Sequence, residues 1–273
     1  ASCQEACSAL LDSREKLGRL SFDYSRLRQF LYSWEKSAFR GTISEKDNSI
    51  NEKSETKDKA AHKLAGDAVE IRLEHVGFTY PGSTKPTIKD INVTLRQGER
   101  IALVGLNGAG KSTLVSLIGR NYDTRSGEIW IAGKRIQDYK LAPLRKHISY
   151  VLQNTSLISG TIKENICMSK PYQADIMNQA LEVSQAKEFV SNLSKGIESP
   201  VVQGGKNFSG GQRQRLTIAR ALYKQADILV LDDCSSALDY ATDAALQKQL
   251  QELKEMTKII ISQRTASLKR CDR

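Results

Sequence analysis

The chain has 273 residues, which is enough for one well-packed domain of ~200 residues and an additional segment. Its 41 Lys and Arg outnumber its 31 Asp and Glu, and the resulting net charge of +10 suits a nucleic acid, an anionic membrane surface or a polyanionic small molecule without distinguishing them. The five cysteines are odd in number and form no CxxC pair, so the sequence favours neither a disulfide framework nor a zinc site and indicates a reducing compartment.

Residues 1–40 carry apolar side chains at the three-, four- and seven-residue spacings of an amphipathic helix. We expect this helix either to pack on its own domain or to offer its apolar stripe to a partner. No apolar run in the chain approaches the ~20 residues that a bilayer-spanning helix needs. The stripe consists of Leu10, Leu17, Leu20, Tyr24, Leu27, Leu31 and Trp34.

Residues 41–67 are rich in charge and nearly free of large apolar side chains. Such a segment cannot bury enough apolar surface to offset the entropy that it would lose on ordering. We therefore predict a flexible linker here, followed by a folded domain over residues 68–273.

From residue 68 onward, short apolar runs alternate with helical patterns. This alternation predicts an α/β fold with a mainly parallel sheet flanked by helices. The early strands follow one another without helices, so we also expect an antiparallel piece beside that sheet. The predicted strands cover residues 69–80, 91–95, 100–105, 127–133, 147–152, 227–232 and 258–262, and the predicted helices begin after Lys111 and Ser209 and cover residues 174–193 and 242–256.

The predicted strand over residues 100–105 leads into the sequence GLNGAGKST and then into a helical pattern. This order fits G-x-x-x-x-G-K-[ST] between a strand and a helix, which is the context of a phosphate-binding loop. The glycines let backbone N–H groups turn toward phosphates, the lysine can reach the β- and γ-phosphates, and the serine hydroxyl can ligate Mg²⁺. The residues predicted to bind are Gly105, Asn107, Gly108, Ala109, Gly110, Lys111, Ser112 and Thr113.

The sequence ILVLDD, residues 228–233, runs an apolar strand into two consecutive acids. In phosphate-loop sites a strand-terminal acid holds Mg²⁺, directly or through water. We predict that Asp232 is this acid and that it shares the metal with Ser112.

The sequence NFSGGQRQR, residues 207–215, resembles the signature motif of ABC-type ATPases, and it precedes the Asp232 strand as it does in that family. Apart from the resemblance, Ser209, Gly210 and Gly211 can open a helix whose exposed N–H groups and hydroxyl suit an anion.

This resemblance extends over residues 69–272 and implies a P-loop NTPase fold with an antiparallel β subdomain and a helical signature subdomain. It implies ATP and Mg²⁺ as cofactors. It also implies a dimer in which the signature, Ser209 to Gln212, contacts the nucleotide of the other subunit.

Three further positions match the family in order along the chain. Tyr80 matches the aromatic residue that stacks on adenine, although an aromatic residue after a strand is otherwise most often part of the core. Gln153 matches the glutamine that contacts Mg²⁺ and the attacking water. Residues 236–239 match the loop that crosses to the other subunit.

Two positions depart from the family pattern. Asp233 stands where the family has a glutamate that polarises the attacking water, and the shorter side chain moves the carboxylate by ~1.5 Å. A misplacement of about 1 Å can cost on the order of 100-fold in rate. Gln263 stands where the family has a histidine that contacts the γ-phosphate, and glutamine cannot relay a proton near neutral pH. We expect Asp233, Gln263 and Gln153 to form a catalytic site that holds ATP and hydrolyses it slowly.

The intact signature and the weakened site together resemble one subunit of a heterodimeric ABC exporter, which couples ATP binding and hydrolysis to export. The resemblance then implies a second ABC ATPase subunit and a transporter membrane domain as partners, at the cytoplasmic face of the cell membrane. Residues 25–31 loosely resemble the end of the last membrane helix in fused exporters. We therefore expect a membrane domain before Ala1, and a C-terminal truncation after Arg273.

The sequence leaves other functions open. Asp233 could suffice as a base in an active homodimeric exporter ATPase, or the chain could be a soluble ABC-type ATPase that acts on nucleic acid. We expect no nucleic-acid partner, because the sequence contains no long coiled-coil insert, second cassette or basic tract with interleaved aromatics. A P-loop kinase is disfavoured because it would need neither the signature nor the loop over residues 236–239.

Overall fold

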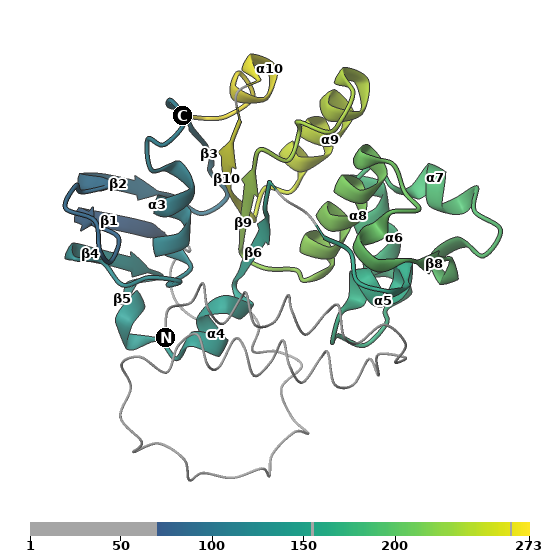
Figure 1. Cartoon of the computed structure of the whole chain (residues 1–273), viewed down its shortest axis with the longest axis horizontal. Helices are drawn as coiled ribbons and strands as arrows, with labels where there is room; N and C mark the ends of the chain where they lie inside the picture. Colours follow the sequence, from purple (N-terminus) through teal and green to yellow (C-terminus); the bar gives the residue numbers. More distant parts are fainter. Residues whose placement is uncertain (1–69, 154–155, 263) are drawn as a thin grey trace, which may run out of the picture. The chain divides into compact units, whose positions relative to one another are not determined.

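The computed structural model describes residues 70–153, 156–262 and 264–273 (Figure 1). The helix predicted over residues 1–40, the linker over residues 41–67 and the domain boundary at residue 68 lie outside these residues, as does Gln263. None of the helices in the described residues is long and apolar enough to cross a membrane.

Four strands form an antiparallel sheet in the order β2-β1-β4-β5. Strand β1 spans Ile71–Phe78, β2 spans Ile88–Leu95, β4 spans Ser126–Ile131 and β5 spans Lys134–Arg135. β1 lies in the middle and pairs antiparallel with both β2 and β4. The sheet therefore contains the first two strands that the sequence predicts to follow one another without a helix, and it adds β4 and β5 from beyond the predicted phosphate-binding loop.

A second sheet is parallel throughout, in the order β3-β10-β9-β6. Strand β3 spans Arg100–Leu103, β10 spans Thr257–Ile261, β9 spans Ile228–Asp232 and β6 spans Ile148–Val151. The carboxyl ends of parallel strands meet at one edge of the sheet, which is where open α/β folds bind ligands. The predicted parallel sheet beside an antiparallel one is confirmed.

Strand β9 separates two apolar cores. Leu229 and Leu231 pack into one core and Ile228 and Val230 pack into the other, and all four side chains are 0% exposed. A strand that is buried on both faces needs a continuous apolar run instead of an alternating one. This requirement explains the run ILVL directly before the two aspartates.

Helices cover both faces of the parallel sheet (Figure 1). Helix α3, Lys111–Ile118, belongs to the core shared with the antiparallel sheet. Helices α5, Ile162–Cys167, α6, Ala174–Val183, α8, Gly210–Tyr223, and α9, Tyr240–Glu252, belong to the opposite core. The remaining elements are α4 Leu141–Lys146, α7 Lys187–Ser191, α10 Thr265–Leu268, the 3-10 helices Ile136–Asp138, Gly196–Glu198 and Gln203–Gly205, and the paired strands β7 Gly160–Thr161 and β8 Pro200–Val201.

The single helix predicted over residues 174–193 is wrong, because the structure has two helices there, α6 and α7. Gln185 lies between them with a left-handed backbone, φ 60°. A helix cannot continue through that conformation, and the N–H of Ala186 instead donates to the carbonyl oxygen of Leu181 at 2.8 Å.

The helix predicted over residues 242–256 also has different bounds, since α9 begins at Tyr240 and ends at Glu252. The side chain of Asp239 accepts a hydrogen bond from the N–H of Thr242 at 2.9 Å and caps the first turn. The last residue of the loop over residues 236–239 therefore also caps the start of the next helix.

We expect Leu231→Ala to lower the free energy of unfolding by about 2–5 kcal/mol, because it removes a fully buried side chain from the central strand and leaves a cavity. Leu106→Ala is the matched control, since the Leu106 side chain is 86% exposed, and its effect should stay within about 0.5 kcal/mol. Urea unfolding followed by circular dichroism measures both variants. Equal losses of stability in the two would contradict the burial of β9.

Candidate functional site

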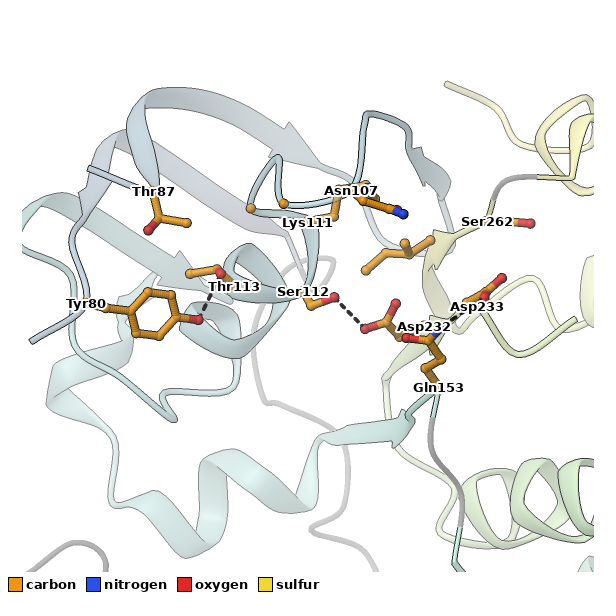
Figure 2. Close-up of a pocket in the computed structure, with 13 residues that line it drawn as sticks. Tyr80, Thr87, Asn107, Lys111, Ser112, Thr113, Gln153, Asp232, Asp233 and Ser262 are labelled. Atoms are coloured by element: carbon orange, nitrogen blue, oxygen red, sulfur yellow. Dashed lines mark hydrogen bonds between the residues drawn. The ribbon is translucent and has the colours of Figure 1, made fainter. Parts of the chain in front are cut away.

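A cavity of about 400 Å³ opens at the carboxyl ends of strands β9 and β10, beside the N-terminus of α3 (Figure 2). Segments that are far apart in the sequence supply its walls. The residues that line it are Tyr80, Thr87, Asn107, Gly108, Gly110, Lys111, Ser112, Thr113, Gln153, Asp232, Asp233, Ile261 and Ser262.

The loop between β3 and α3 needs glycine at two positions. Gly108 and Gly110 have φ angles of 80° and 90°. Residues that carry a Cβ atom disfavour this left-handed region, whereas glycine adopts it readily. A Cβ atom on Gly110 would also lie 2.6 Å from Cδ1 of Ile88 and 3.0 Å from the carbonyl oxygen of Thr87. The tight turn leads directly into α3, whose first N–H groups have no partner within the helix and carry partial positive charge. The loop therefore has the shape and polarity that suit a phosphate group.

Lys111 opens helix α3, and its ammonium group lies within the loop. Nζ donates to the carbonyl oxygens of Gly105 at 2.8 Å and Leu106 at 2.9 Å. The full positive charge thus stands beside the glycine turn, and both features favour an anion in the cavity.

Ser112 and Asp232 meet across the cavity floor. The Ser112 hydroxyl donates to Oδ2 of Asp232 at 2.7 Å, which joins the start of α3 to the end of β9 (Figure 2). Asp232 is only 9% exposed. A hydroxyl oxygen and a carboxylate at this separation suit the hard oxygen coordination of Mg²⁺.

No cluster of three or more His, Cys, Asp or Glu that could hold a metal occurs in the described residues. Mg²⁺ is commonly bound through one or two carboxylates together with waters and phosphates of a ligand. The oxygen donors of Ser112 and Asp232 therefore fit a metal ion that is also coordinated by a phosphorylated ligand. The described residues contain no site in which protein side chains alone would complete the coordination.

Asp233 and Gln153 face each other next to this pair. Nε2 of Gln153 donates to Oδ2 of Asp233 at 3.4 Å (Figure 2). Asp233 has a left-handed backbone, φ 49°, and its N–H donates to the carbonyl oxygen of Ile261 at 2.8 Å. Burial raises the pKa of the Asp233 carboxyl, the charge of Asp232 raises it further, and Arg264 and the Gln153 hydrogen bond lower it. The chain thus places a strained, partly buried carboxylate one residue beyond the metal-suited acid.

Tyr80 lines the opposite side of the cavity. Its Oη shares a hydrogen bond with Oγ1 of Thr113 at 2.9 Å (Figure 2). Its ring contacts Phe78 edge-on, with the centroids 4.9 Å apart. Tyr80 is therefore both attached to the core and part of the cavity wall, so the two roles that the sequence leaves open are compatible.

The signature residues are not part of this cavity. Ser209 caps α8 by accepting the N–H of Gln212 at 3.2 Å, and the side chain of Gln212 accepts the N–H of Ser209 at 2.9 Å. Ser209 and Gly210 are exposed. A Cβ atom on Gly211 would lie 3.1 Å from the carbonyl oxygen of Ala237. The signature therefore lies against the loop over residues 236–239 of its own chain and not against its own phosphate loop.

The cavity gathers most of the residues predicted for the chain's own nucleotide site. Of the loop residues, Gly105 and Ala109 are the two that do not line it. Sequence reasoning missed Thr87, Ile261 and Ser262. Ile261 and Ser262 lie at the carboxyl end of β10, and the sheet order places that strand beside β9. Nothing in the local sequence indicates that Thr87 lines the cavity.

A family model described as ABC transporter matches residues 88–236, which is more than half of the chain. The ATP-dependent lipid A-core flippase of Vibrio cholerae is 39% identical over 206 residues, covering 74% of this chain and 35% of the relative. A putative multidrug export ATP-binding/permease protein of Staphylococcus aureus is 40% identical over 205 residues, covering 74% of this chain and 36% of the relative.

Among solved structures, a bacterial Atm1-family ABC exporter with ATP bound superimposes with a TM-score of 0.72 at 28% identity. The alignment covers 79% of this chain and 38% of that one. The chain spans little more than a third of the length of the curated relatives it matches. These matches, together with the phosphate loop and the strand-terminal acids, establish that the chain belongs to the ABC transporter family.

Proposed function

We propose that this chain is an ATP-binding domain of an ABC exporter and that ATP binds with Mg²⁺ in the cavity at the carboxyl ends of β9 and β10. The observation that carries the proposal is the 2.7 Å contact between Ser112 and Asp232 beside Lys111. This contact brings a phosphate loop and a metal-suited acid together from positions 120 residues apart.

In this proposal the loop over residues 105–110 and the N-terminus of α3 bind the β- and γ-phosphates through backbone N–H groups and Lys111. Ser112, Asp232 and Gln153 hold the metal, which supplies charge neutralisation for the phosphate oxygens when bound. The ring of Tyr80 stacks on the adenine. Asp233 orients the attacking water. From its position in the sequence, Gln263 is assigned the contact to the γ-phosphate.

Lys111→Ala should weaken the affinity for MgATP about 10- to 100-fold, because it removes a charge-assisted hydrogen bond to phosphate. Lys248→Ala on α9 is the matched control, since that lysine is exposed and does not line the cavity. Isothermal titration of each variant with a non-hydrolysable ATP analogue and Mg²⁺ gives the two dissociation constants. Unchanged affinity in Lys111→Ala would refute the assignment of the cavity.

We further propose that this site hydrolyses ATP slowly. Asp233 keeps the charge of the family's glutamate on a shorter side chain, and its backbone is constrained by the bond to Ile261 and by its left-handed conformation. On this backbone the aspartate carboxylate lies about one C–C bond, ~1.5 Å, short of the position that a glutamate could reach. At position 263 the sequence has glutamine where the family has a histidine that contacts the γ-phosphate.

One observation favours a second candidate, an active homodimeric ATPase. The raised pKa of Asp233 makes its carboxylate a stronger base than an ordinary aspartate, and Gln153 orients it. In that case the aspartate would be a competent replacement for glutamate.

Steady-state Mg²⁺-dependent ATP hydrolysis separates the two candidates. We expect the natural chain to bind ATP and turn over slowly, and the double change Asp233→Glu, Gln263→His to raise the rate at least about tenfold by restoring the reach of the base and the γ-phosphate contact. The same double change in a Lys111→Ala background is the control and should give no gain. Brisk turnover of the natural chain, with no gain from the double change, would favour the homodimer.

The location of the signature supports a proposal about the partners. Because Ser209 to Gln212 lie outside the chain's own cavity, we propose that they contact the nucleotide of a second ABC ATPase subunit, which forms a heterodimer with this chain and supplies the hydrolysing site. One relative is named as a lipid A-core flippase and the other as a putative multidrug export ATP-binding/permease protein. Because the names differ in cargo, we propose a membrane domain as the other partner and assign no transported molecule. The domain would then act at the cytoplasmic face of a membrane.

A further inference from the structure

Three aromatic side chains form a cluster next to the cavity, Phe78, Tyr80 and Tyr122. Tyr80 and Tyr122 are nearly perpendicular, at 85°, with their ring centroids 5.4 Å apart. Phe78 contacts both rings, and as a core residue that is only 4% exposed it forms the fixed base of the cluster. Edge-to-face pairs at such separations are attractive beyond their buried area.

Tyr122 remains 43% exposed and does not line the cavity itself. Its ring contacts that of Tyr80, which does line the cavity. An effect of Tyr122 on a ligand would therefore act through the ring of Tyr80.

The segment that presents Tyr122 is held firmly. Nη1 of Arg120 donates to the carbonyl oxygens of Ile136, Gln137 and Tyr139, at 3.3, 3.2 and 2.9 Å. The side chain of Arg120 also pairs with that of Asp123 at 3.1 Å. Hydrogen bonds on both sides of Tyr122 thus restrain its backbone.

The same segment follows directly on helix α3. The N–H of Asn121 donates to the carbonyl oxygen of Ser116 at 2.9 Å, which ties it to the last turns of the helix. Thr113, in the first turn of α3, bonds to the hydroxyl of Tyr80 (Figure 2). The ring of Tyr80 is thus held by residues from both ends of the helix that opens with Lys111.

We propose that Tyr122 is a positioning residue for recognition of an aromatic base, because it fixes the ring of Tyr80 relative to the phosphate loop. This inference rests on the proposed function, since it assigns the Tyr80 wall to the base of the bound nucleotide. A preoriented ring loses little freedom when a base stacks on it, and that saving strengthens binding. We expect no effect of Tyr122 on phosphate binding, because the rings that it contacts are those of Phe78 and Tyr80 and it does not line the cavity.

A purely structural role would affect every ligand of the cavity alike. The test therefore uses isothermal titration to compare the dissociation constants of two Mg²⁺-bound ligands. One is a non-hydrolysable ATP analogue, and the other is tripolyphosphate, which has no base. The variants are Tyr122→Ala, Tyr122→Leu, which keeps apolar bulk, and Tyr122→Phe, which keeps the ring. Tyr172→Ala is the matched control, because Tyr172 is 46% exposed and lies outside the cavity.

We expect Tyr122→Ala and Tyr122→Leu to weaken the affinity for the ATP analogue about three- to tenfold and to leave the affinity for tripolyphosphate unchanged. Tyr122→Phe and Tyr172→Ala should bind both ligands as the natural chain does. Equal weakening for both ligands, or no weakening for either, would overturn the inference. A natural chain that binds neither ligand would instead contradict the proposed function, and the inference with it.

Discussion

Strand β9 is buried on both faces, and the two apolar cores and the cavity are arranged around it. Its four apolar residues divide two cores, so the strand cannot shift its register without moving side chains into the wrong one. That fixed register determines where the strand ends, which is at Asp232, and Asp233 follows directly. The acids therefore occupy the sheet edge because the core holds the strand that precedes them.

Helix α3 brings the complementary groups to the same edge. Its apolar residues pack in the same core as Ile228 and Val230 of β9, and this packing places the N-terminus of α3 beside the end of β9. The hydrogen bond between Ser112 and Asp232 is the point where the two elements meet. On the other face, α8 packs in the core that Leu229 and Leu231 share and carries the signature away from the chain's own cavity. One sheet thus carries the cavity and the signature at different places, as the proposed second subunit requires.

The sequence predicted those features whose cause is local. The phosphate loop is recognisable because two of its positions adopt a left-handed backbone and therefore carry glycine. Strand β9 is recognisable because a strand that is buried on both faces of a sheet has a continuous apolar run. Features that depend on packing were missed. Thr87 reaches the cavity only because β2 lies near the loop, and Gln185 divides a continuous helical pattern by a single φ angle. The cluster around Tyr122 likewise joins residues whose proximity arises from the fold alone.

In the proposed function, Ser112 and Asp232 hold the metal of a bound nucleotide. A crystal structure of the chain with Mn²⁺ and a non-hydrolysable ATP analogue would locate that metal, because Mn²⁺ gives an anomalous signal. We expect an anomalous peak within coordination distance of the Ser112 hydroxyl and beside the Asp232 carboxylate, with the triphosphate along the N-terminus of α3. A nucleotide bound elsewhere, with the Ser112 hydroxyl still donating to Asp232 and no peak beside them, would refute this assignment.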